Sequence, residues 1–177
     1  MRRGWMSISM AVLTLTGLTG CSPAVDGVGG VRLDGTGRLV AVLSWCAAFG
    51  VPRTIILYPA ESGGGVGDPL LRLERTGDAP DGDFLEVTLA EPGSQWKSEG
   101  TIPAALTDGS DDGGYEVRAW DESGEHRVRS FPFTLAEVRA ADPARPILTK
   151  TYQGDDRYAS SLLSTEEFQD TAGQECD

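Results

Sequence analysis

Cationic side chains are scarce in this sequence, and histidine is almost absent. The 177 residues include 15 lysines and arginines against 27 acidic residues, and the formal net charge is −12. Lys97 and Lys150 are the only lysines. Such an excess of acid argues against nucleic-acid binding, because that function needs a basic surface. It also predicts repulsion from an anionic lipid surface.

The single histidine, His126, limits the catalytic chemistry that the chain can carry. It follows a turn among charged residues, so we expect a solvated side chain rather than a general base. No Gly-x-Ser-x-Gly motif occurs, and segment 109–113 (GSDDG) has the wrong spacing for a nucleophile elbow. Close carboxylate pairs arise by chance in so acidic a chain and do not indicate a glycosidase. We therefore expect no enzyme activity, and a secreted-type hydrolase is the weakest alternative.

No apolar run in the N-terminal region is long enough to span a bilayer. Segment 8–18 (ISMAVLTLTGL) has about half of the roughly 20 residues that a spanning helix needs. Arg2 and Arg3 precede it, and Leu18-Thr19-Gly20-Cys21 closes it. The whole segment resembles a bacterial lipoprotein signal peptide, with Leu18-Thr19-Gly20-Cys21 as its lipobox. The resemblance implies cleavage before Cys21 and lipidation of this cysteine with a diacylglycerol and an N-terminal acyl group, which anchor it in the membrane.

A lipoprotein of this kind divides into three parts. Residues 1–20 are the signal peptide, residues 21–29 a flexible tether, and residues 30–177 the folded domain. Loss of Arg2 and Arg3 leaves 13 basic and 27 acidic residues, so the mature charge is −14. The tether reaches at most about 30 Å, so we expect the domain near the extracytoplasmic face of the cytoplasmic membrane. In a bacterium with one membrane this is the cell surface.

Three cysteines occur, and the lipobox takes Cys21. Cys46 and Cys176 remain, and an even pair in an extracytoplasmic chain predicts a disulfide between them. Two free buried thiols are the alternative. Two distant cysteines and one histidine do not make a zinc site. Apart from the covalent lipid at Cys21, we expect no cofactor.

Short apolar segments separated by glycine, aspartate and proline predict an all-β fold. Segment 38–46 (RLVAVLSWC) is apolar on both faces, so we expect a central strand with Trp45 toward the main core. Pro132 predicts an edge or bulged strand. A capping box at Ser164-Thr165-Glu166-Glu167 predicts a short helix over 165–172, ended by Gly173. The expected strands are 31–33, 38–46, 54–58, 70–75, 84–90, a short one near Trp96 and Ile102, 115–120, 127–135 and 147–152.

Strand 115–120 (YEVRAW), its acidic turn 121–125 and the early tryptophan Trp45 resemble immunoglobulin-like and fibronectin type III-like modules. The resemblance implies an antiparallel, immunoglobulin-like β-sandwich of about seven or eight strands in one domain. The Cys…Trp…Cys arrangement of true immunoglobulin domains is absent. The layout is also similar to that of small actinobacterial lipoproteins without an assigned activity.

Two groups of residues are candidate sites. Asp108, Asp111 and Asp112 lie in a glycine-rich loop whose carboxylates suit Ca²⁺, although Asp-Gly runs are also ordinary turn formers. Trp96 and Trp120 are candidate anchors for an envelope protein or a glycan, with packing under the C-terminal tail as the alternative. The favoured function is a membrane-anchored, non-catalytic binding or structural module of the cell envelope. A small-ligand or Ca²⁺-binding lipoprotein is the alternative.

Overall fold

The computed structural model describes residues 24–46, 50–61, 65–103, 106, 113–154 and 157–176. Strands dominate it, and a short helix lies near the C-terminus, so the predicted β-rich fold is confirmed. The strands are β1 (Ala24–Leu33), β2 (Leu39–Trp45), β3 (Thr54–Pro59), β4 (Leu71–Arg75), β5 (Phe84–Thr88), β6 (Trp96–Gly100), β7 (Gly114–Trp120), β8 (His126–Arg129), β9 (Pro132–Thr134), β10 (Ile147–Gly154) and β11 (Arg157–Leu163). The helices of this described part are α2 (Leu135–Arg139) and α3 (Thr165–Glu175). Neither is long and apolar enough to cross a membrane.

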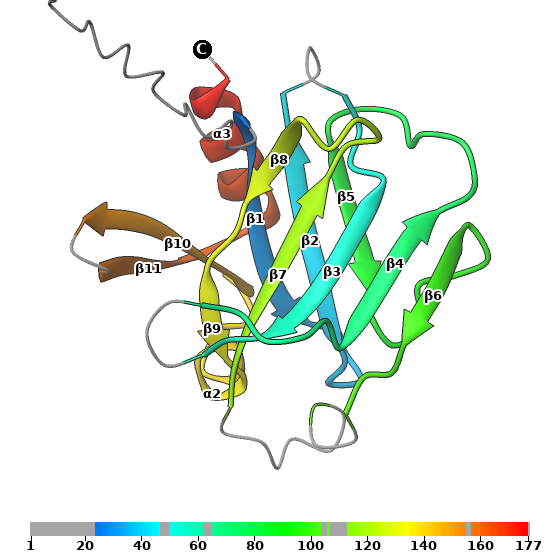
Figure 1. Ribbon diagram of the computed structural model, residues 1–177. Coiled ribbons are helices and arrows are strands. Elements are labelled where there is room, and N and C mark those ends of the chain that lie inside the picture. The colour runs from blue at the N-terminus through cyan, green and yellow to red at the C-terminus, as the bar shows by residue number, and fades with distance from the viewer. Residues whose placement is uncertain are drawn as a thin grey trace, which may run out of the picture.

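The strands form one curled, mixed sheet (Figure 1). Its strand order is β11-β10-β1-β8-β7-β3-β4-β6, with the β10–β11 hairpin at one end. Off this path, β2 pairs with β1 and β5, and β9 pairs with β7. β1 lies antiparallel to β2 and β10 but parallel to β8. The prediction of a purely antiparallel sheet is therefore wrong at the β1–β8 pair. Ala24 pairs there with His126, and no local sequence pattern encodes the direction in which two such distant segments meet.

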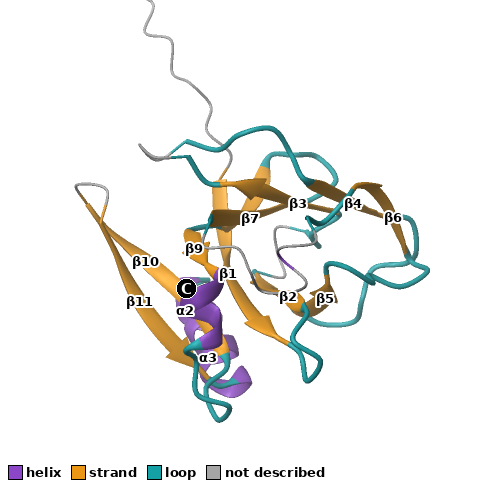
Figure 2. Ribbon diagram, turned by 90° about the horizontal axis from the view of Figure 1, so that it is seen from below, coloured by secondary structure: helices purple, strands orange, loops and turns teal. Residues whose placement is uncertain are grey.

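The main core lies inside the curl of the sheet. In the view from below, β3, β4 and β7 lie opposite β2 and β5 (Figure 2). Side chains from both sides meet in this core, among them Leu43 of β2, Leu73 of β4 and Tyr115 of β7. Burial of their apolar surface is the main favourable contribution to folding.

β2 is buried along its whole length, as predicted for a central strand. Leu43 and Trp45 belong to the main core, whereas Val40 and Val42 belong to a second, smaller core. Alternation along the strand explains this division, because successive side chains point to opposite faces. The buried residues of the second core are Val28, Val40, Val42, Ile147, Phe168 and Ala172.

β1 begins inside the segment that was expected to be a flexible tether. Residues 24–29 are strand, which corrects that expectation; residues 21–23 lie outside the described residues. The glycines of this segment allow close packing rather than flexibility. A Cβ on Gly27 would lie 2.3 Å from the carbonyl oxygen of Ser44, and one on Gly30 would lie 2.6 Å from Cγ2 of Ile147. Only glycine permits the backbone of β1 to approach its neighbours so closely.

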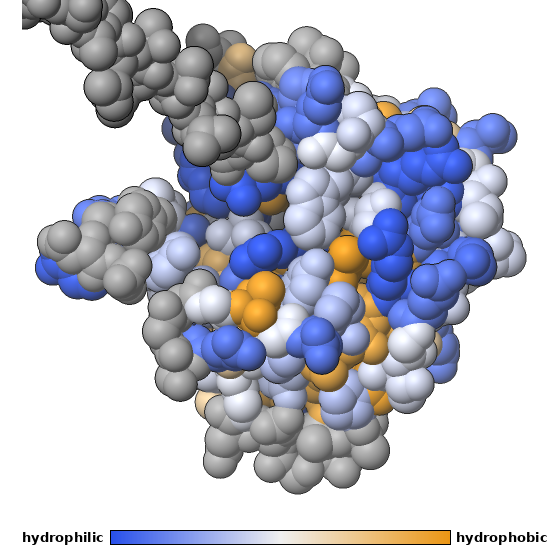
Figure 3. All heavy atoms as spheres, viewed as in Figure 1, coloured by the Kyte–Doolittle hydropathy of each residue, from blue (hydrophilic) through white to orange (hydrophobic). Residues whose placement is uncertain are grey.

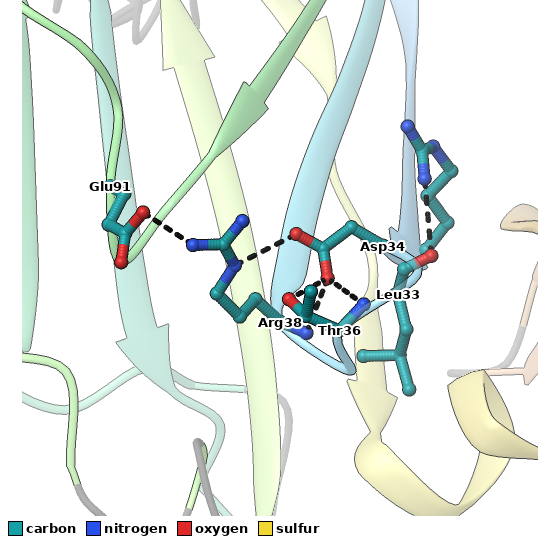
Figure 4. Close-up of polar contacts among 6 residues, drawn as sticks. Leu33, Asp34, Thr36, Arg38 and Glu91 are labelled. Atoms are coloured by element: carbon teal, nitrogen blue, oxygen red, sulfur yellow. Dashed lines mark hydrogen bonds and ion pairs between the residues drawn. The ribbon is translucent and has the colours of Figure 1, made fainter.

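The turn between β1 and β2 is held by Asp34 (Figure 4). One carboxylate oxygen accepts hydrogen bonds from the backbone N–H and the hydroxyl of Thr36, at 2.8 and 2.7 Å, and from the N–H of Arg38 at 3.0 Å. The guanidinium of Arg38 binds the other oxygen and also pairs with Glu91. The Thr36 hydroxyl and these further donors hold the pKa of Asp34 far below its ordinary value. The strands expected at 31–33 and 38–46 are therefore both present, and this turn pairs them as an antiparallel hairpin.

The strands expected on either side of the acidic turn 121–125 are present and paired, but the second one is interrupted. β8 pairs with β7 near Ala119, and β9 resumes the pairing with β7 from Pro132 onward. Pro132 therefore opens a separate strand, because it lacks the N–H of a continuous ladder. Thr134 forms a capping box with Glu137 and begins α2, a helix that we did not expect.

The C-terminal helix is longer than predicted, and a disulfide fixes its end. α3 begins at Thr165 behind the predicted capping box but continues to Glu175, so Gly173 lies inside the helix. Cys176 follows the helix and is bonded to Cys46, with a Cα–Cα distance of 5.4 Å. The predicted disulfide is thus present and joins α3 to the end of β2.

Candidate functional site

A groove lined by three arginines lies between the start of β1, strands β7 and β8, and the β10–β11 hairpin. Its volume is about 400 Å³. Figure 3 shows how far this hairpin, at the left, projects from the body of the molecule. We call this groove the arginine groove. The residues that line it are Val25, Glu116, Arg118, Arg127, Arg129, Ser130 and Tyr158.

Strand alternation places the three arginines on one face. Val128 lies in the main core, so its neighbours Arg127 and Arg129 face outward. Arg118 faces outward in the same way, because Ala119 beside it lies in the core. The guanidinium of Arg118 also lies over the ring of Tyr58, 5.3 Å from its centroid. The groove is therefore built on regular strands, which hold its charges in place.

Two of the three guanidinium groups have counter-ions. Arg118 Nε donates to Oε1 of Glu116 at 2.6 Å. Arg129 binds both carboxylate oxygens of Glu175 on α3. Arg127 has no ion-pair partner in the described part of the chain, and its buried Nε has no hydrogen-bond partner there. A buried donor left in this way carries a desolvation cost that a bound acceptor removes.

Apolar side chains flank this cation. Val25 and Tyr158 are the large apolar residues with the most exposure in the described chain, at 42% and 39%. Both line the arginine groove, and Val25 pairs with Arg127 across the β1–β8 junction. Guanidinium groups match phosphate and carboxylate oxygens in geometry and charge. The groove can therefore accept an anionic group that carries an apolar part.

His126 is bound rather than solvated, which corrects the expectation from its position after a turn. Its Nδ1 lies 2.6 Å from Oδ2 of Asp26, and the side chain of His126 is half-buried. The hydrogen bond with Asp26 raises the pKa of His126, and the charges of Asp26, Asp121 and Glu125 act in the same direction.

The free energy of unfolding should fall as the pH rises through the folded-state pKa of His126. A raised pKa means that the folded protein binds the proton more tightly than the unfolded chain, whose histidine pKa is about 6.5. The added stability is complete below that unfolded value and disappears above the folded one. Urea denaturation across this pH window measures it, and His126→Gln should remove this part of the pH dependence. An NMR titration that places the pKa of His126 at or below about 6.5 would contradict the expectation.

The two candidate tryptophans have different environments. Trp96 is 7% exposed and lies in the main core, so the prediction that it anchors a partner is wrong. It opens the edge strand β6 and packs inward, whereas the rest of that strand is exposed. Trp120 is half-buried and lines a shallow pocket of about 350 Å³ together with Thr54 and Tyr58. Trp120 therefore stays a candidate.

Four predicted site residues, Cys21, Asp108, Asp111 and Asp112, lie outside the described residues. Within the described ranges, no group of three or more histidine, cysteine, aspartate or glutamate side chains is placed to hold a metal ion. The Ca²⁺ prediction stays a prediction.

Sequence reasoning missed the arginine groove. The alternation Arg127-Val128-Arg129 predicts that both arginines share a face, but the groove also needs Val25 and Tyr158 from segments far away in the chain.

Comparison with protein-family models, curated proteins and solved structures finds no match to this chain.

Proposed function

We propose that the protein is a lipid-anchored module of the bacterial cell envelope that binds a partner without catalysing a reaction. One observation carries the proposal: the lipobox Leu18-Thr19-Gly20-Cys21 stands immediately before the fold, because β1 starts at Ala24, the third residue after Cys21. The Cys46–Cys176 disulfide supports an oxidising, extracytoplasmic compartment. It also leaves neither of these cysteines as a free nucleophile.

The proposal includes an immunoglobulin-like β-sandwich as the fold of this module. The curled sheet supports it, because β2 and β5 contribute to the same core as β3, β4 and β7. The hairpin of β7 and β8 supports it as well, since it contains the strand on which the resemblance rests.

We propose the arginine groove as the binding surface. It combines the guanidinium of Arg127, which has no ion-pair partner among the described residues, with the exposed apolar surface of Val25 and Tyr158. On a protein with a net charge of −12, such a groove favours an anionic partner over a basic one at this position.

Mass spectrometry of the protein isolated from bacterial membranes tests the anchor. The expected mature chain starts at Cys21 and carries the mass of a diacylglyceryl group and an additional acyl chain. Cys21→Ser should leave the precursor unprocessed and without lipid, because serine has no thiol to form the thioether. Cys176→Ser is the matched control, since it removes a cysteine outside the lipobox and should keep the lipid. A mature N-terminus elsewhere, or a Cys21 without lipid, would refute the proposed function.

A further inference from the structure

We propose that the arginine groove binds the phosphate of an anionic phospholipid headgroup in the membrane that holds the anchor. The groove would then turn one defined face of the domain toward that membrane. This inference rests on the proposed function, because it needs Cys21 to be inserted in the same bilayer.

The charge of the groove supports a phosphate ligand. Arg118 and Arg129 are paired with carboxylates, and Glu116 also accepts a hydrogen bond from Ser130 at 2.7 Å. Within the part of the chain that the structure describes, Arg127 is the groove arginine that no carboxylate pairs with. Its planar guanidinium can bind two oxygens of a phosphate at once. Arg129 shows the same two-oxygen geometry, because it binds both carboxylate oxygens of Glu175.

The apolar rim of the groove supports a lipid as the source of that phosphate. Val25 of β1 and Tyr158 of β11 are exposed and line the groove together with the arginines. Tyrosine is enriched where membrane proteins meet the headgroup region, because its ring is apolar and its hydroxyl is polar. A free phosphate compound would gain nothing from this rim, whereas the acyl boundary of a bilayer would.

The distance from the anchor supports the same membrane. Val25 is four residues after Cys21, so the chain allows at most about 14 Å between them. The acidic surface of the domain repels an anionic bilayer, but charges separated by more than the screening length of about 8 Å interact weakly at physiological ionic strength. Val25 lines the groove and pairs with Arg127, so the same short stretch of chain keeps Arg127 near the bilayer that holds the anchor.

Arginine-specific labelling with phenylglyoxal tests the inference on the full lipidated protein. The protein is placed in nanodiscs of phosphatidylcholine alone or of phosphatidylcholine with phosphatidylglycerol, and labelling is followed by peptide mass spectrometry. We expect Arg127 to react about fivefold more slowly in the anionic discs, the factor that corresponds to about 1 kcal/mol per arginine at such a surface. Arg72, exposed and outside the groove, is the internal control and should react equally in both.

A pair of substitutions tests whether Arg127 carries the effect. A headgroup held by Arg127 also covers Arg118 and Arg129, which line the same groove, so we expect both to react more slowly in anionic discs. Arg127→Gln should abolish this slower labelling of Arg118 and Arg129, whereas Arg72→Gln should preserve it. Sodium chloride at about 0.5 M should also abolish it, because the screening length falls to roughly 4 Å. The comparison of discs needs no substitution, so it decides the question even if Arg127→Gln does not fold.

Three outcomes would overturn the inference. Equal labelling of Arg127 in both discs means that the groove does not contact the headgroups. Protection by glycerol phosphate added to neutral discs assigns the groove to a soluble phosphate compound instead. A chain whose mass shows no lipid at Cys21 refutes the proposed function as well, whereas a lipidated chain without protection refutes the headgroup contact alone.

Discussion

Replacing both Cys46 and Cys176 with alanine should lower the free energy of unfolding by about 5 kcal/mol. The two cysteines are 130 residues apart in the chain, so their disulfide removes a large closure entropy from the unfolded state. For a domain of this size, the loss corresponds to a decrease in melting temperature of roughly 10–20 °C. Thermal unfolding followed by circular dichroism measures it, with and without a reductant for the unsubstituted protein.

The same experiment has a local control. Gln174 lies on α3 close to the disulfide but is exposed, so Gln174→Ala should change stability by less than about 0.5 kcal/mol. Loss of the disulfide should also speed hydrogen exchange in α3 before the rest of the fold, because Cys176 joins this helix to the end of β2. A melting temperature that is unchanged by reduction would show that the bond contributes nothing to stability.

Phe168→Ala should lower the free energy of unfolding by about 3–5 kcal/mol. Phe168 is fully buried in the second core, and its ring lies edge-on to Phe84 with the centroids 6.4 Å apart. Alanine would leave a cavity between α3 and the face of β1 and β2, since the smaller side chain loses these contacts. Urea denaturation measures the change.

Gln169→Ala is the matched control for Phe168→Ala, because Gln169 is the exposed neighbour on the same helix. Its expected effect is below about 0.5 kcal/mol. Equal losses for the two variants would mean that α3 is not packed on the sheet through Phe168. Combining Phe168→Ala with loss of the disulfide should cost less than the sum of the two, since both changes release the same helix.

Local patterns predicted the parts of the fold whose partners are close in the chain. The alternation in β2 assigned Trp45 to the main core correctly, and the strands expected at 31–33 and 38–46 are joined by the turn at Asp34. The capping box at Ser164 set the start of α3, although the helix passed Gly173. The capping box from Thr134 to Glu137 was an equally local signal that would have found α2, but the segment was interpreted as strand.

The predictions failed where a residue's environment depends on distant strands. Glycines in residues 24–29 indicated a tether, yet Gly27 and Gly30 serve as points of close contact with β2 and β10. The residues around Trp96 in the sequence do not indicate that it is buried, because its place in the core depends on how the edge of the sheet curls. In both cases the composition of the segment does not reveal which distant strand packs against it.

The sequence by itself determined the class of fold, the central strand, the pairing of Cys46 with Cys176 and the expectation of a lipid at Cys21. These follow from alternation, from a count of three cysteines and from one short motif, all of which are local or countable. Only the tertiary structure decided that β1 and β8 run parallel and that Arg127 lines a groove together with Val25 and Tyr158. The reason is physical: pairing of distant strands is selected by the packing of the whole core, which no single segment encodes.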